Sequence, residues 1–323
     1  MKRIFHVTVI ALTVLLFTPL AAMAQAYPSK TVRVVIPWPP GGSNDIVGRI
    51  VLQKMGESMG QQFVVDNRPG AAGAIGAEVV AKAPPDGYTL MVHSTTHVGN
   101  AHLYKKLTYD TLKDFTGVGL LSAQPGVLTV HPSLPVKTTR EFLALAKSRP
   151  GQIFYSSSGN GSAPHLQMAL LASMAGIKLV HVPYKGGVPQ VTALVSGETQ
   201  VSFATIGTVI NQIRQGKLRP LGVGSAQRTK ALPDVPTISE SGVPGYEMAP
   251  WVGMFAPAGT PKAIIDKLNA EANKALKLPD VVQKLENQVL DPWASTPEEF
   301  NARLKVDYEK YGKLIQLTGA KIE

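Results

Sequence analysis

The sequence contains no cysteine among its 323 residues. This absence excludes disulfide bonds, a catalytic thiol, a cysteine-based metal site and a lipid-modified N-terminal cysteine. Without disulfides, the fold has to be held together by its hydrophobic core. A chain of roughly 300 residues is long enough to build such a core, and we expect it to divide into two lobes.

Long apolar runs and runs of one charge are also missing. No stretch of 18 apolar residues follows residue 20, so no later membrane span is expected. The 32 Lys and Arg residues outnumber the 22 Asp and Glu residues and give a formal charge of +10, but they are scattered singly. Because no basic stripe with interleaved aromatic residues occurs, we expect no nucleic-acid partner. A diffusely basic surface favours encounter with small anions.

Residues 1–26 have the three parts of a cleaved signal peptide. Lys2 and Arg3 form a basic start, Ile4–Leu20 is almost wholly apolar, and two possible cleavage sites follow at Ala22–Ala24 and Ala24–Ala26. The apolar run is short for a membrane anchor. The sequence therefore predicts export, and we expect a soluble periplasmic monomer.

The stretch Trp38–Asp45 connects a predicted strand to a predicted helix. The preceding segment Val32–Pro37 is apolar and β-branched, and apolar residues from Val47 to Met55 recur at helical spacing. Two adjacent glycines leave backbone N–H groups uncovered, and a helix N-terminus adds unpaired donors with a partial positive charge. The stretch therefore suits an anion. The alternative is a plain connecting loop that needs glycine for its backbone angles.

Two more loops share this position. Strands and helices alternate along the chain, which predicts an α/β fold with parallel sheets covered by helices on both faces. Ser157–Ser162 and Tyr184–Gly187 are rich in Gly or Ser, and each follows a predicted strand and opens a predicted helix. Since ligands bind at the carboxyl ends of strands in open α/β sheets, we expect the three loops to share one anion site.

The candidate ligand-binding residues come from these loops, from the helix after the second loop and from the end of a further strand. They are Trp38, Pro40, Gly41, Gly42, Ser43, Asp45, Ser157, Ser158, Gly159, Gly161, Ser162, His165, Lys185, Gly186 and Thr205. Asp45 is expected to cap its helix and order the glycine loop. A rival role for Asp45 is to receive an amine or hydroxyl of the ligand.

Seven short motifs resemble those of Bug-type (Bordetella uptake gene family) substrate-binding proteins of tripartite tricarboxylate transporters. They are Pro39–Ile46, Asp66–Gly70, Lys82–Tyr88, Val182–Gly187, Leu232–Thr237, Ala256–Pro261 and Thr296–Phe300. The resemblance implies a two-lobed periplasmic binding fold of type II topology, in which each lobe is a mainly parallel sheet flanked by helices. The lobes would close on a small mono- or dicarboxylate held by the first two loops, and the membrane components of the transporter would be partners.

The resemblance also suggests how the chain is divided. We expect residues 27–122 and 247–323 to form the first lobe and residues 123–246 the second, joined by hinges at Leu121–Val127 and Ala249–Val252. The chain departs from the family pattern at Ala193 and Ser196, where an acid and a glycine are common, and at Trp38, where Phe is common. The ligand therefore cannot be transferred from any relative.

Other functions are less well supported. A secreted α/β enzyme acting on small organic acids stays open as the alternative, but we expect no catalytic residue. Gly56–Gly60 matches a G-x-S-x-G nucleophile elbow, which needs a strand before the serine, whereas a helix is predicted there. His93, His97 and His102 have no carboxylate at metal-ligand spacing, so we expect solvated or loop histidines and neither a metal nor a cofactor. A ligand-sensing domain of a transcription regulator conflicts with the signal peptide.

Overall fold

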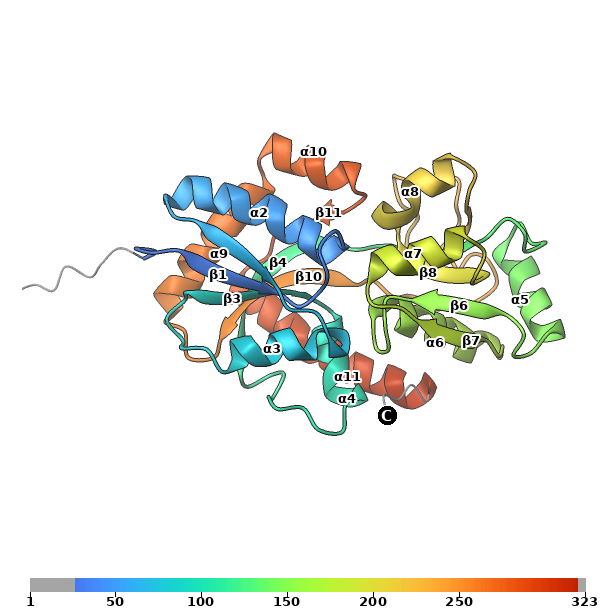
Figure 1. The fold of residues 1–323 in the computed structure, drawn as a ribbon, viewed down its shortest axis with the longest axis horizontal. Coiled ribbons are helices and arrows are strands. Elements are labelled where there is room, and N and C mark those ends of the chain that lie inside the picture. The colour runs from blue at the N-terminus through green and yellow to red at the C-terminus, as the bar shows by residue number, and fades with distance from the viewer. Residues whose placement is uncertain (1–26, 319–323) are drawn as a thin grey trace, which may run out of the picture.

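A computed structural model describes residues 27–318, which form two α/β lobes lying side by side (Figure 1). Each lobe is a sheet flanked by helices, as the two-lobed prediction requires. The predicted signal peptide, residues 1–26, lies outside the described residues. Among the described helices, none combines the length and apolarity needed to cross a membrane.

The first lobe contains a six-stranded sheet in the spatial order β11-β4-β10-β3-β1-β2. Its strands are β1 (Val32–Ile36), β2 (Phe63–Asn67), β3 (Thr89–Ser94), β4 (Phe115–Ala123), β10 (Trp251–Pro257) and β11 (Asp291–Pro292). All seven residues of β10 are buried, because this strand lies inside the sheet with helices over both faces. Burial on both faces explains why the central strands are nearly continuous apolar runs.

The second lobe contains a five-stranded sheet in the order β7-β6-β8-β5-β9. Its strands are β5 (Gly126–Val130), β6 (Phe154–Ser157), β7 (Val180–Pro183), β8 (Val201–Thr205) and β9 (Arg219–Val223). The chain thus crosses from the first sheet to the second after β4 and returns before β10. The exact lobe boundaries at residues 122 and 246 stay a prediction.

The directions of the strands place the carboxyl ends of the parallel strands of each sheet near these crossings. β1 is parallel to β2 and β3, and β6 is parallel to β7 and β8, whereas β10 and β5 run against their neighbours. The start of β5, Gly126, therefore pairs with Thr205 at the end of β8. Likewise Val252, near the start of β10, pairs with Ser94 at the end of β3. The carboxyl ends of the parallel strands in both lobes consequently face the space between the lobes.

Helices cover both faces of each sheet, and each face has its own apolar cluster. In the first lobe, Val51 and Leu268 belong to the cluster on one face, and Phe300 belongs to the cluster on the other. In the second lobe, Met168 and Ile210 lie in the two opposite clusters. The helices are α2 (Ser43–Met59), α3 (Ala74–Ala81), α4 (Thr96–Leu103), α5 (Thr139–Ser148), α6 (Ala163–Ala175), α7 (Gly187–Val195), α8 (Ile206–Arg214), α9 (Lys262–Leu276), α10 (Pro279–Asn287) and α11 (Pro297–Thr318), with a 3-10 turn η1 (Ala71–Gly73) before α3.

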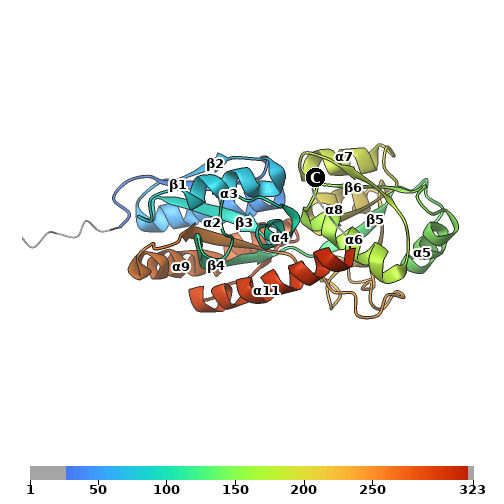
Figure 2. The ribbon, with the colours of Figure 1, turned by 90° about the horizontal axis from the view of Figure 1, so that it is seen from below.

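Packed contacts also join the lobes besides the crossings. α11 extends from the first lobe beneath the second (Figure 2), where Tyr311 shares an apolar cluster with Leu166 of α6. Val289, in the turn between α10 and β11, packs into the apolar cluster formed by α7 and α8. Gly207 of α8 lies against the backbone of Gln288 with no room for a Cβ atom. The position of one lobe relative to the other is therefore determined by packing as well as by the two crossings.

Candidate functional site

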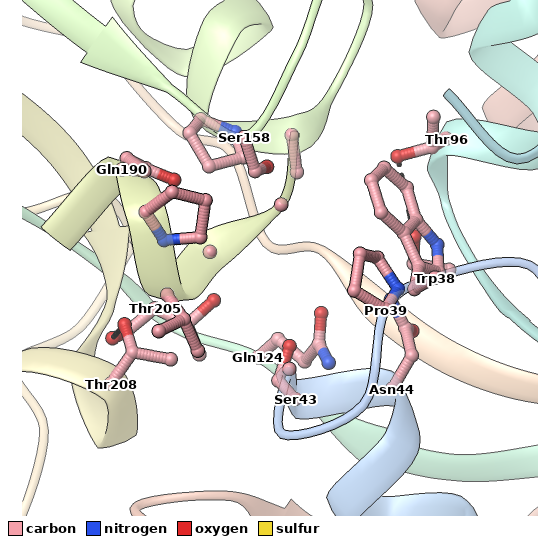
Figure 3. A pocket seen from close by; sticks show the side chains of 18 of the residues that line it. Trp38, Pro39, Ser43, Asn44, Thr96, Gln124, Ser158, Gln190, Thr205 and Thr208 are labelled. Carbon is pink, nitrogen blue, oxygen red and sulfur yellow. Dashed lines mark hydrogen bonds between the residues drawn. The ribbon is translucent and has the colours of Figure 1, made fainter. Parts of the chain in front are cut away.

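A cleft lies between the two lobes, where the strand ends converge (Figure 3). It encloses about 650 Å³, including space open to solvent. The lining residues are Trp38, Pro39, Pro40, Gly42, Ser43, Asn44, Ser94, Thr96, Gln124, Ser158, Ala163, Pro164, Gly186, Gly187, Val188, Pro189, Gln190, Thr205 and Thr208. None of these residues carries a charged side chain. The cleft is therefore lined by neutral hydrogen-bonding groups and by apolar surface.

Five helices begin at this cleft. The residues at their N-terminal ends that line it are Ser43 of α2, Thr96 of α4, Ala163 of α6, Gly187 of α7 and Thr205, the N-cap of α8. The first N–H groups of a helix have no partner within the helix and carry partial positive charge. Several such ends make the cleft favourable for an anion even though no lysine or arginine among residues 27–318 lines it.

The first loop is held by Asp45, which is 3% exposed and lies on the side of the loop away from the cleft. Its carboxylate accepts hydrogen bonds from Gly41 N–H, Arg49 Nε and Asn67 Nδ2, each at 3.0 Å. Burial by itself would raise the pKa of Asp45, but the hydrogen bonds from Arg49, Asn67 and Gly41 lower it below its ordinary value. Asp45 therefore orders the loop as an ionised group. It does not act as the N-cap, which is Gly42 without a side-chain bond.

In the second loop several polar groups point into the lobe. Ser157 Oγ lies 2.6 Å from His181 Nε2, and Gly161 N–H donates to His165 Nδ1 at 3.0 Å. The rings of His165 and His181 stack 4.2 Å apart. Burial lowers the pKa of His165 to about 4. Burial, followed by the nearby His165, lowers the pKa of His181 to about 3. Both imidazoles are therefore neutral at pH 7 and support the loop from within the lobe.

The structure distributes the candidate residues over three locations. Those that line the cleft are Trp38, Pro40, Gly42, Ser43, Ser158, Gly186 and Thr205. Gly159 and Lys185 line a neighbouring cavity instead. The candidates that line neither space are Gly41, Asp45, Ser157, Gly161, Ser162 and His165. Ligand binding by all of these candidates stays a prediction. The residues that line neither space would affect binding only by holding the loops in place.

Six polar residues that line the cleft were not predicted from the sequence: Asn44, Ser94, Thr96, Gln124, Gln190 and Thr208. Ser94 ends β3 and Thr96 opens α4, so the same rule of strand ends and helix starts could have found them. Gln124 has no such local signal. It lies at the crossing between the sheets, where its N–H donates to Pro250 O of the return crossing at 2.8 Å.

The histidines near β3 differ from the expectation of solvated or loop residues, which is wrong for two of them. His93 and His97 are completely buried, and the ring of His97 on α4 packs edge-on against Phe115 and Phe255 of the first sheet. Burial, with His97 beside it, lowers the pKa of His93 well below its ordinary value. His93 Nδ1 accepts from Trp38 Nε1 at 3.3 Å and from Ser94 N–H at 2.8 Å. His93 therefore holds the side chain of Trp38, which lines the cleft, in place. In residues 27–318 no group of three or more metal-ligating side chains is present.

Comparison with known proteins identifies the family. A family model described as "Tripartite tricarboxylate transporter family receptor" matches residues 47–320. Protein BugT of Bordetella pertussis is 33% identical over 303 residues, which cover 93% of this chain and 93% of BugT.

Two solved structures are also similar over nearly the whole chain. Rpa4515 of R. palustris, with adipate, is 34% identical with a TM-score of 0.88, and the match covers 92% of this chain and 100% of that chain. MatC of Rhodopseudomonas palustris, with bound malate, is 32% identical with a TM-score of 0.84, covering 90% and 100%. A third structure, of the periplasmic binding protein BugD, is 30% identical with a TM-score of 0.86, covering 92% of this chain and 100% of that chain. The family is one of transporter receptors, and with this binding protein it removes the enzyme alternative. The chain therefore belongs to the tripartite tricarboxylate transporter receptor family, as its motifs predicted, and is a Bug-type periplasmic solute-binding protein.

Proposed function

We propose that the protein captures a small mono- or dicarboxylate between its lobes and presents it to the membrane components of a tripartite tricarboxylate-type transporter. The observation that carries this proposal is the uncharged cleft on which five helix N-termini converge. The adipate and malate bound to the two similar structures support a carboxylate as the ligand class.

Recognition would depend on backbone N–H groups and neutral side chains. In the described chain the N–H of Gly42 has no protein acceptor, and the hydroxyls of Ser43 and Ser158 belong to the cleft lining. A hydrogen bond to a charged group contributes about 1.5–3 kcal/mol. Two or three convergent bonds would therefore favour an ionised carboxylate over its uncharged amide by roughly 10²–10⁴-fold.

The test is a thermal-shift screen of mono- and dicarboxylates, followed by calorimetry on the hits and on their amides. We expect a Kd of about 0.1–10 μM for the best acid and a large loss for its amide. An amide that binds as tightly as its acid, or a screen in which no carboxylate binds while phosphonates or sulfonates do, would contradict the proposal.

Binding should be accompanied by lobe closure. The crossings beside Gln124 and Pro250 are short and are joined by one backbone hydrogen bond, so they are suited to hinge bending. Solution scattering with and without a saturating acid should show a smaller radius of gyration in the complex. Identical curves would contradict the hinge.

A further inference from the structure

The turn between α10 and β11 places two neighbouring residues in the cores of different lobes. Val289 is 7% exposed and belongs to the apolar cluster formed by α7 and α8 of the second lobe. Leu290, the next residue, is 1% exposed and belongs to a cluster of the first lobe. The turn therefore lies on the boundary between the lobes, on the side of the molecule where Figure 1 shows α10 and α8.

This turn is fixed to the first lobe by its backbone. The N–H of Val289 donates to Glu286 O at 2.8 Å, and the N–H of Leu290 donates to Leu285 O at 3.0 Å. These are the two hydrogen bonds of a Schellman motif, which ends a helix with one residue in the left-handed conformation. The strand that follows, β11, pairs with β4. The turn is therefore part of the first lobe and moves with it.

Valine is an unfavourable residue at the left-handed position of this motif. Val289 has a φ of 54°, and a β-branched side chain is strained there, which is why such helix ends normally use glycine. The residues after α2 and α6 follow that rule, since they are Gly60 with a φ of 67° and Gly176 with a φ of 64°. Strain of this kind persists only where other contacts compensate for it. The apolar cluster that Val289 enters belongs to the second lobe, so its local strain is offset across the lobe boundary.

The second lobe meets this turn with a glycine. A Cβ atom on Gly207, near the start of α8, would lie 2.8 Å from the carbonyl carbon of Gln288 and closer still to its oxygen. Two backbones in such contact cannot approach further. Gly207 is not among the glycines with positive φ, and alanine is the better helix former, so α8 by itself does not require glycine here. The requirement comes from the neighbouring lobe.

The contact is linked to the cleft through α8. Thr205 and Thr208, which flank Gly207, line the cleft. On the other side of the cleft the lobes are also close, because a Cβ atom on Gly186 would be 3.0 Å from Pro39 Cγ. The lobes are therefore drawn together in this arrangement, and the backbone contact at Gly207 limits how near α8 can come to the first lobe.

We propose that Gly207 and the turn Gln288–Leu290 form an interlobe stop, in which the backbone contact fixes the separation of the lobes and Val289 holds them at that separation. None of these residues lines the cleft, so they act by positioning the start of α8 against the loops of the first lobe. The effect of the stop on ligand affinity rests on the proposed function, whereas its effect on lobe separation does not.

Spin labels measure the separation directly, because the chain has no native cysteine. Gln283→Cys on α10 and Lys217→Cys after α8 place labels at exposed positions of the two lobes. In this background Gly207→Ala should widen the distance between the labels without ligand, because α8 and the turn have to separate to admit a Cβ atom. The affinity for a carboxylate, measured by calorimetry, should fall about tenfold or more, since the binding-competent arrangement is less populated.

Asn211→Ala is the matched control. Asn211 is exposed on the same helix and does not line the cleft, so this change should alter neither the label distance nor the affinity. Equal effects of Asn211→Ala and Gly207→Ala would assign the change to α8 itself and overturn the stop.

Val289→Gly tests the stop from the first lobe. It gives the turn the residue that the motif prefers and withdraws the side chain from the second lobe, so the turn stays intact while the lobes are held less firmly. The label distances should become broader and the affinity should fall about three- to tenfold. Adding Val289→Gly to Gly207→Ala should change the affinity little further, because both variants act on one contact.

The outcomes separate this proposal from the proposed function. Unchanged label distances in both Gly207→Ala and Val289→Gly would overturn the stop, and so would altered distances with an unchanged affinity. If the unmodified protein binds no carboxylate, the proposed function fails, and the label distances of the ligand-free variants still decide whether the stop exists.

Discussion

The loops after β1 and β6 have similar compositions but present different surfaces to the cleft. The first uses an ionised group, Asp45, to hold Gly41 N–H from behind, which leaves Gly42 and Ser43 at the cleft. The second turns Ser157 toward the neutral His181, and Ser158 is the one serine of this loop that lines the cleft. Each loop thus uses part of its polar groups to hold itself in place. A Gly- and Ser-rich loop therefore contains both ligand contacts and supports, and composition does not separate them.

The largest effect should come from removing a backbone donor of the first loop. Gly42 has φ −78°, which proline can adopt, so Gly42→Pro removes the N–H and leaves the turn possible. We expect carboxylate affinity to fall a hundredfold or more, about 2.7 kcal/mol, because a charged hydrogen bond and the loop geometry are lost together.

Gly42→Ala is the matched control, measured by calorimetry and thermal unfolding alongside the proline variant. An added Cβ would lie 3.6 Å from Pro39 O, an ordinary contact, and the N–H is kept. Alanine should bind within a fewfold of the unmodified protein. If proline binds as well as alanine, recognition through the backbone is wrong.

The serines of the second loop should separate by function. Ser158→Ala removes a hydroxyl from the cleft and should weaken binding about tenfold or more without changing the free energy of unfolding. Ser157→Ala should instead lower that free energy by about 1 kcal/mol and change affinity less than threefold, because its hydroxyl bonds to groups inside the lobe. Calorimetry and denaturant unfolding of both variants check this, and the reverse pattern would contradict the assignment.

Replacing Asp45 tests the support of the first loop. Asp45→Asn keeps an acceptor for Gly41 N–H but removes the charge that faces Arg49, so the free energy of unfolding should fall by about 1–2 kcal/mol. Simple dicarboxylates should bind almost normally. A loss confined to amine-bearing ligands would support the rival role of contacting the ligand.

The pH dependence of Asp45 has a defined sign. Its pKa is lower in the folded protein than in the unfolded chain. The stabilisation that ionised Asp45 gives to the folded protein is therefore present above the unfolded pKa of about 4. It is lost as the pH falls through the folded pKa. Urea unfolding of the unmodified protein and of Asp45→Asn checks this: their free energies of unfolding should differ at pH 7 and become more similar at pH 3.

Protonation of His165 behind the second loop should change the free energy of unfolding in milder acid. This is the smallest of the predicted effects. The folded pKa of His165 is about 4, below the unfolded value of about 6.5, so unfolding takes up protons and stability falls as the pH drops from 6.5 toward 4. His165→Asn keeps an acceptor near Gly161 N–H but does not titrate. It should reduce the stability loss between pH 7 and pH 5.5 by about 1 kcal/mol. Parallel pH profiles would show that the pKa of His165 is the same in the folded and the unfolded protein, which contradicts the prediction.

The alternation of strands and helices could be predicted from the sequence because it follows from the local spacing of apolar residues. The loops at the strand ends could be predicted for the same reason. The orientation of Asp45 and Ser157 could not, because it depends on Asn67 and His181 from distant parts of the chain. α4 was also missed. Its Gly99 packs against Tyr311 of α11, so tertiary contacts compensate for its weak helical propensity.

The position of β10 sets an order of folding. The second sheet is built from one continuous segment, residues 126–223, whereas β10 enters between β3 and β4 only after that segment has been made. Until Trp251–Pro257 is available, β3 and β4 each lack a neighbour and present open edges. Pairings so distant in sequence form slowly. The last quarter of the chain therefore completes the first lobe. A chain cut before residue 251 contains every strand of the second sheet, whereas its first sheet lacks β10 and β11.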